Sequence, residues 1–217
     1  MVAATSAAFE RFRFSFFEDA NSARDGLDIA ALAALKGQEI TRAEDLLIGF
    51  LPDTRAVIGL GELRTRRAKP RLVQLFETER RMQREGRAAG NGVGVAAGLV
   101  YLAKALWRIC PDPRWLEAVI DVLGTAEDWT QRMEAAIALH DVCDAAAVRA
   151  LTEALDDPLS LVRYHAARAL LAIYGLPAEP EGSEHMIVRL MADDTARRQG
   201  GKREVLAAIA RRPIRTP

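Results

Sequence analysis

The chain has 217 residues, of which 50% are hydrophobic and 28% are charged, and its 30 basic side chains balance its 30 acidic ones. This composition excludes a disordered or collagen-like chain, and the abundant alanine with only 6% aromatic residues favours helix over strand. The length predicts one domain or one elongated array.

Residues 1–24 are expected to form an aromatic cap segment. Five of the seven phenylalanines lie in residues 9–17, interleaved with arginines. Phe9, Phe12 and Phe16 share one helical face, so the segment either packs onto the helices that follow or lies on a membrane surface. Packing is the favoured alternative because acidic residues weaken attraction to anionic lipid. The charged residues of this segment also interrupt the apolar stretch that a signal peptide needs. No apolar run in the sequence approaches the roughly 18 residues of a membrane span, so we expect neither a signal peptide nor a membrane-spanning helix.

A repeat is clearest in the second half of the chain. Residues 128–139 and 161–170 superpose with an offset of 31 residues, which places Arg132 and Arg163 at equivalent positions. Apolar pairs then recur with the spacing of one helical face. These pairs are Ala135 and Ala166, Leu139 and Leu170, and Val142 and Ile173.

The same register continues towards the N-terminus, with offsets of 46 and 33 residues between the earlier units. Asp53 and Leu99 take the place of the arginine in those units, and a second apolar helix follows each first one. The apolar sets are Ala56, Leu60 and Leu63, then Leu72, Leu75 and Phe76, then Leu102, Leu106 and Ile109, then Leu116, Val119, Ile120 and Leu123, then Val148, Leu151 and Leu155, then Met186, Ile187 and Leu190.

Capping residues agree with these boundaries. Asp112-Pro113 and Asp157-Pro158 each place a carboxylate before a proline suited to the first helical position. Gly124 and Gly175 lie where helices are expected to end.

Helix pairs with a period of 31 to 46 residues are typical of an α-solenoid, in which neighbouring hairpins must stack to bury their apolar faces. We therefore predict an all-α fold of about five stacked hairpins in residues 25–192, with a weak first hairpin at 25–51 and a glycine-rich loop near 82–95. Residues 193–217 are expected to form a C-terminal capping helix and tail.

The segment Asp157-Pro158-Leu159-Ser160-Leu161-Val162-Arg163, followed by Ala166, Ala167 and Leu170, resembles HEAT-like repeats of the PBS-lyase type. The resemblance implies an α-solenoid that binds other molecules. It implies no catalytic residues.

Charge is segregated along the chain although it cancels overall. Residues 64–87 hold nine basic and three acidic side chains, whereas residues 112–157 hold eleven acidic and three basic ones. Complementary potentials steer association, so we predict two partner-binding patches; the alternative for each single residue is an ordinary solvated helix face. The acidic patch comprises Asp112, Asp121, Glu127, Asp128, Glu153, Asp156 and Asp157, and the basic patch comprises Arg64, Arg66, Arg67, Lys69 and Arg71.

Catalytic and metal chemistry is not expected. His140, His165 and His185 lack metal-ligand spacing and a neighbouring nucleophile, and Cys110 and Cys143 are too few for a disulfide framework. We predict no cofactor, no metal and no catalytic residue, with two thiols packed in a protein of the reducing cytoplasm.

Nucleic acid is a weaker candidate partner than protein. Some HEAT-like proteins are DNA glycosylases that use tryptophan and aspartate in a basic groove, for which Trp107, Trp115 and Asp112 are candidates. The chain has a pI near 6.9, and its acidic stretch follows directly on its basic one. Such a charge distribution is poorly suited to binding the phosphate backbone of a nucleic acid. Ordinary packing accounts for both tryptophans.

The resemblance implies a non-enzymatic protein-binding function. Arginine far outnumbers lysine, which fits a bacterial source, and bacterial HEAT-like proteins of this size include immunity proteins that neutralise a secreted toxin by occlusion. An enzyme or enzyme subunit of the bilin lyase or DNA glycosylase type, or a generic adaptor or assembly factor, are the alternatives. We expect a protein partner, with a cognate toxin as one candidate, and no membrane.

Overall fold

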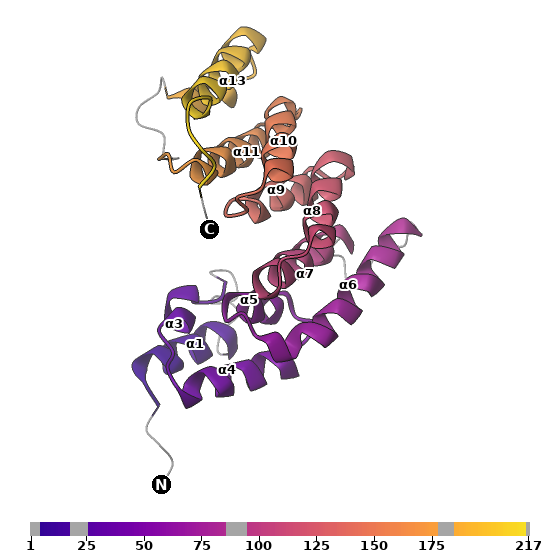
Figure 1. Ribbon diagram of the computed structural model, residues 1–217, viewed down its shortest axis with the longest axis vertical. Helices are drawn as coiled ribbons and strands as arrows, with labels where there is room; N and C mark the ends of the chain where they lie inside the picture. Colours follow the sequence, from indigo (N-terminus) through magenta and orange to yellow (C-terminus); the bar gives the residue numbers. More distant parts are fainter. Residues whose placement is uncertain (1–4, 18–25, 86–94, 178–184, 216–217) are drawn as a thin grey trace. The chain divides into compact units, whose positions relative to one another are not determined.

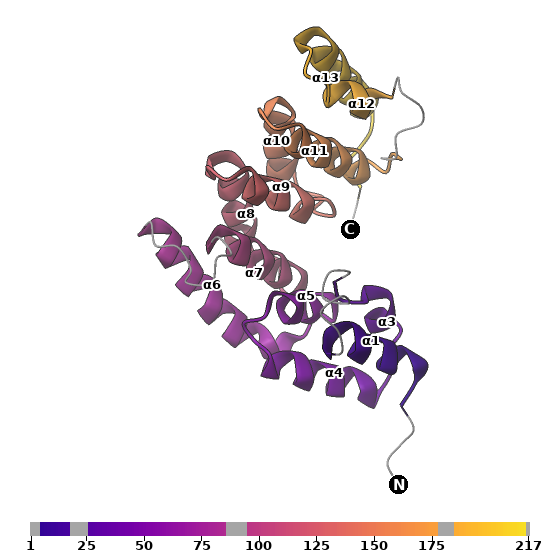
Figure 2. The same cartoon turned by 180° about the vertical axis from the view of Figure 1, so that it is seen from behind.

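The computed structural model of the chain describes residues 5–17, 26–85, 95–177 and 185–215, and every regular element in these ranges is helical (Figures 1 and 2). The all-α, solenoid-type prediction is therefore confirmed. The chain divides into two compact units, Met1–Trp115 and Leu116–Pro217, here called the N-terminal and C-terminal units.

The N-terminal unit contains the aromatic segment, the weak first hairpin, the hairpin that follows it and the first helix of the next hairpin. Helices α5 and α6 both pack against α7, and α1 packs against α3. The elements are α1 (Ala7–Phe17), α3 (Ile29–Ala33), α4 (Gln38–Gly49), α5 (Thr54–Glu62), η1 (Arg66–Ala68), α6 (Lys69–Arg84), α7 (Val95–Ile109) and the first turn of α8 (Pro113–Thr125).

Aromatic side chains fill the N-terminal end of this unit. Phe9, Phe12 and Phe16 are all buried, as their shared face predicts. Two of these rings have contacts at α4: the Arg42 guanidinium lies 4.5 Å from the centroid of the Phe9 ring, and the ring of Phe16 lies 5.3 Å from that of Phe50, the residue just after the helix. The aromatic face is thus occupied within the unit.

The C-terminal unit holds the clearest repeats. Helices α9 and α11 pack side by side, and α12 packs between α11 and α13 (Figures 1 and 2). All six predicted equivalent apolar residues, from Ala135 to Ile173, are buried. The elements after α8 are α9 (Trp129–Ala138), α10 (Ala145–Glu153), η2 (Ala154–Asp156), α11 (Ser160–Ile173), α12 (Met186–Leu190) and α13 (Thr195–Ile209).

One of the two predicted helix starts is correct. Helix α8 begins at Pro113, and the Asp112 carboxylate accepts a hydrogen bond from the Arg114 backbone N–H at 3.1 Å. Helix α11 instead begins at Ser160, so the prediction that Pro158 is its first residue is wrong. The Asp157 carboxylate accepts the Leu159 backbone N–H at 2.8 Å, so Pro158 lies in the turn that precedes the helix.

One of the two predicted helix ends is also correct. Gly175 has a φ of +70°, and the backbone N–H groups of Gly175 and Leu176 donate to the carbonyls of Ala172 and Leu171, which is a Schellman motif. Gly124 lies inside the last turn of α8, which continues to Thr125, so that prediction is wrong by about one residue. Most of the predicted loop near 82–95 lies outside the described residues. Its ends are helical and not loop, since α6 continues to Arg84 and α7 begins at Val95.

Helix α7 carries a lysine in an unfavourable position. Burial lowers the pKa of Lys104 to about 7, and repulsion from Arg108 adds to this effect, whereas Glu62 opposes it. Arg108 and Glu62 form an ion pair with each other. The protonated lysine is therefore much less favourable in the folded chain than in the unfolded one.

We expect Lys104→Met to raise the free energy of unfolding by about 1–4 kcal/mol near pH 6, because a buried charge is replaced by an apolar side chain of similar length. Below pH 7 both states bind the proton, so the wild type bears the full cost. Between pH 7 and the ordinary lysine value of 10.5, the unfolded chain binds more protons, so wild-type stability rises with pH. Urea unfolding of the wild type and of the variant at about pH 6 and about pH 10 measures the difference in their free energies of unfolding and its dependence on pH. A variant less stable than wild type near pH 6 contradicts the prediction.

Candidate functional site

Arg163 is almost completely enclosed in the C-terminal unit. Its exposed fraction is 1%, and Nη1 donates to the carbonyls of Asp157 and Pro158 at 2.7 and 2.8 Å. Nε donates to the carbonyl of Leu190 at 2.9 Å, at the end of α12. Desolvation lowers the pKa of Arg163, although a guanidinium stays charged at any physiological pH. One side chain thus joins the turn before α11 to the turn after α12.

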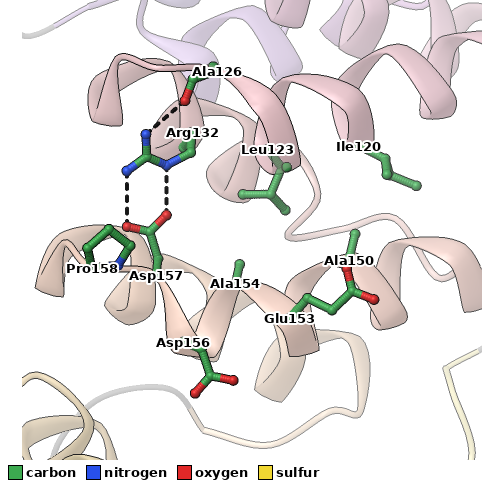
Figure 3. A pocket seen from close by; sticks show the side chains of 11 residues that line it. Ile120, Leu123, Ala126, Arg132, Ala150, Glu153, Ala154, Asp156, Asp157 and Pro158 are labelled. Atoms are coloured by element: carbon green, nitrogen blue, oxygen red, sulfur yellow. Dashed lines mark hydrogen bonds and ion pairs between the residues drawn. The ribbon is translucent and has the colours of Figure 1, made fainter.

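Arg132 repeats this arrangement one unit earlier. Nη1 donates to the carbonyls of Ala126 and Glu127 at 2.8 and 3.0 Å, the same two sequence separations as at Arg163. Nε and Nη2 donate to the two carboxylate oxygens of Asp157 at 2.7 and 3.2 Å (Figure 3). The side chains are only 12% and 7% exposed, and the pair raises the pKa of Arg132.

Asp157 therefore links the turn before α9 to the turn before α11. Its Oδ1 also accepts the Leu159 backbone N–H at 2.8 Å, so its side chain orders the turn before α11 while it binds Arg132. A bidentate, largely desolvated pair of this kind fixes geometry better than an exposed one. The two turns, residues 126–128 and 157–159, are held together.

A groove of about 480 Å³ lies between α8 and the α10–η2 segment. Ile120 and Leu123 reach into it from α8, and Ala150 and Ala154 line the opposite wall (Figure 3). The Arg132–Asp157 pair lies at one end. The complete lining is Ile120, Leu123, Gly124, Ala126, Arg132, Ala150, Glu153, Ala154, Asp156, Asp157 and Pro158.

Three predicted acidic residues line this groove, in different electrostatic states. Asp157 is held by Arg132, and Asp156 pairs with Lys202 of α13, which lowers the pKa of Asp156. Glu153 is exposed, and no cation of the described chain forms an ion pair with it. Within the described part of the chain, the groove therefore presents one carboxylate, that of Glu153, without a counter-charge.

The other predicted acidic residues lie outside the lining. Asp121, Glu127 and Asp128 are exposed residues of the C-terminal unit, and Asp128 caps α9 by accepting the Thr130 backbone N–H at 2.9 Å. That bond lowers the pKa of Asp128. Asp112 belongs to the N-terminal unit and pairs with Arg114 at 3.1 Å.

The predicted basic residues of the N-terminal unit are mostly engaged. Arg67 forms ion pairs with Glu44 and Asp45 at 2.9 and 2.7 Å, which raises the pKa of Arg67. Lys69 Nζ lies 3.3 Å from the Cys110 Sγ, and the Arg71 guanidinium donates to Gln74 at 2.7 Å. Arg64 and Arg66 are exposed, and Arg66 and Lys69 border a second groove with Ile109, Cys110 and Pro111.

Trp115 is unavailable for a DNA-binding role. It is buried, its ring packs 4.8 Å from that of Phe76, and its indole N–H donates to the Cys110 carbonyl at 3.2 Å. The packing interpretation is confirmed for this tryptophan, and Trp107 is half-buried on α7.

The described residues offer no metal-binding group. No three His, Cys, Asp or Glu side chains among them converge, and both cysteines are free thiols. His185 accepts the Ile187 backbone N–H at the start of α12, and burial lowers the pKa of His165. None of the helices in the described ranges has the length and apolar character needed to cross a membrane.

Comparison with known families identifies the repeat. Residues 99–171, which run from α7 to α11, match the family model of HEAT repeats. This segment of the chain is similar to HEAT repeats. Arrays of HEAT repeats are protein-interaction scaffolds, because stacked hairpins present a rigid, extended surface. A search among curated proteins found no match to the chain.

Sequence reasoning missed the role of several groove residues. Sequence periodicity places Ile120 and Leu123 only on the buried face of a helix. Arg132 and Arg163 serve there only to align the two repeats. The sequence offers no signal for the contacts of the arginines with the preceding turns, because backbone carbonyls accept these bonds and any residue supplies a carbonyl. The groove has no sequence signal either, since it depends on how α8 and α10 are spaced.

Proposed function

We propose that this HEAT-repeat protein is a non-enzymatic, cytoplasmic binding protein and that the groove of the C-terminal unit is its docking site. The observation that carries the proposal is an apolar groove with the uncompensated carboxylate of Glu153, built on turns that Arg132 and Asp157 hold in place. A preformed surface needs little ordering when a partner docks, which favours affinity.

The mode of action is stoichiometric occlusion. The acidic residues of the C-terminal unit cover a basic surface of the partner, and the opposite potentials accelerate encounter and reject unsuitable partners. Free thiols in both cysteines are in keeping with a reducing cytoplasm.

The finer proposal is an immunity protein that occludes the basic active site of a secreted bacterial toxin. Its support is the resemblance in size, in degenerate repeats and in charge segregation to bacterial HEAT-like immunity proteins. An adaptor or assembly factor would use the same surface and differ only in its partner. Protection of cells that co-express a neighbouring toxin separates the two.

The test is affinity capture from producing cells with tagged wild type, Glu153→Lys and Glu77→Lys. Glu77 is an exposed acidic residue of α6 and provides a matched charge reversal far along the chain from the groove. We expect a stoichiometric protein partner that high salt releases, and an affinity lower by about tenfold or more for Glu153→Lys alone.

Recovery of nucleic acid or of a coloured cofactor in place of a protein contradicts the proposal. So does a partner whose binding is weakened by Glu77→Lys and not by Glu153→Lys. Circular dichroism of each variant shows that the fold is retained.

A further inference from the structure

We infer that the groove of the C-terminal unit receives an arginine or lysine of the partner together with an adjoining apolar side chain. This inference rests on the proposed function and names the chemistry of the segment that docks. Its basis is the combination of an apolar floor, one unpaired carboxylate and an exposed apolar edge.

The floor suits the stem of a long cationic side chain. Ile120 and Leu123 are three residues apart on α8 and share a helix face, and Ala150 of α10 and Ala154 at the start of η2 are four residues apart on the opposite wall. Arginine and lysine place their methylene groups along apolar surface and keep the charged head at its edge. Glu153 lies on the same lining and supplies the carboxylate for that head.

The charges of the groove select the sign of the ligand. The carboxylate of Asp156 pairs with Lys202, and that of Asp157 pairs with Arg132, so both carboxylates already have a counter-charge within the chain. Glu153 has no such partner among the described residues. An acidic ligand would therefore meet an uncompensated like charge, whereas a basic ligand completes the pairing.

Exposed apolar side chains follow directly on the two turns at the Arg132–Asp157 end of the groove, and we call them the apolar edge. Trp129, Leu159 and Leu161 are 37%, 39% and 41% exposed at the starts of α9 and α11. Arg132 lines the groove and bonds both turns that precede these helices, so each of the three side chains lies within three residues of a lining residue, Ala126 or Pro158. Aromatic and aliphatic anchors of this kind commonly accompany arginine at interfaces.

Gly124 provides a clean way to fill the groove. It lines the groove, and a Cβ built on it meets nothing within 4 Å. We therefore expect Gly124→Phe to place its ring in the groove without a backbone or core clash at Cβ and without a change of charge, and Gly124→Ala is the matched control.

The experiment is selection of short random peptides on the immobilised full-length chain, followed by affinity measurement of the selected peptides by fluorescence anisotropy. We expect enrichment of peptides with arginine or lysine beside an apolar residue. Their affinity should fall by about tenfold or more for Gly124→Phe, for Glu153→Lys and on replacement of the peptide arginine by citrulline, and stay unchanged for Gly124→Ala.

Selection of acidic peptides, or equal binding to wild type and Gly124→Phe, overturns the inference. So does a dimer of the chain that Gly124→Phe dissociates, since a second copy would then occupy the groove. If the peptide experiment fails in one of these ways but a protein partner is still captured in a Glu153-dependent manner, the proposed function stands and only the inferred chemistry of the docking segment is wrong. If no partner is captured and no peptide binds, the proposed function fails as well.

Discussion

Replacement of Arg163 by methionine is expected to destabilise the protein by about 3–5 kcal/mol. Methionine retains much of the volume but leaves the carbonyls of Asp157, Pro158 and Leu190 without the donors that now bind them. Buried acceptors that lose their partners bear the full cost of desolvation. Urea unfolding followed by circular dichroism measures the change.

Two further variants isolate the cause. Arg149→Met removes an exposed arginine of α10 and is expected to change stability by less than about 0.5 kcal/mol. Arg163→Lys keeps the charge and loses the planar fork, so we expect a loss between those of the other two variants. Equal stability of Arg163→Met and Arg149→Met would show that the carbonyl network contributes little.

The second large effect is expected at the contact between α12 and α13. A Cβ on Gly201 would lie 2.5 Å from the Leu190 backbone nitrogen and 2.6 Å from the Met186 carbonyl oxygen. Backbone atoms cannot rotate away as a side chain can, so the helices must separate. We expect Gly201→Ala to lower the free energy of unfolding by about 3 kcal/mol.

The preceding residue gives the matched control. A Cβ on Gly200 meets nothing within 4 Å, and glycine within a helix is less favourable than alanine. Gly200→Ala should therefore raise stability by about 0.5–1 kcal/mol. Thermal unfolding of the two variants should shift in opposite directions; a shift of the same sign in both would contradict the close packing of α12 on Gly201.

Helical periodicity predicted most of the fold. The 31-residue offset between Arg132 and Arg163 located two repeats, and the apolar residues in register with them are buried. Such patterns are informative because a solenoid buries the same helix face in every unit. Asp53 stands at the arginine position of an earlier unit and caps α5 instead, so the arginine contacts are confined to the later repeats that the structure describes.

The candidate site was less accessible from the sequence. Pairing of Asp156 with Lys202 joins residues that are 46 apart, and pairing of Arg132 with Asp157 joins residues that are 25 apart. Counting charges along the chain cannot reveal which carboxylates are balanced by distant cations. Glu153 looked equivalent to its neighbours in sequence and differs from them only through tertiary contacts.

Amide hydrogen exchange of the full-length chain, with and without its captured protein partner, tests the docking site most directly. Binding at the groove predicts slower exchange in residues 117–128 and 149–160, with α6 unchanged. Slower exchange confined to residues 66–84, where the predicted basic patch lies, would contradict the account and assign partner binding to the N-terminal unit.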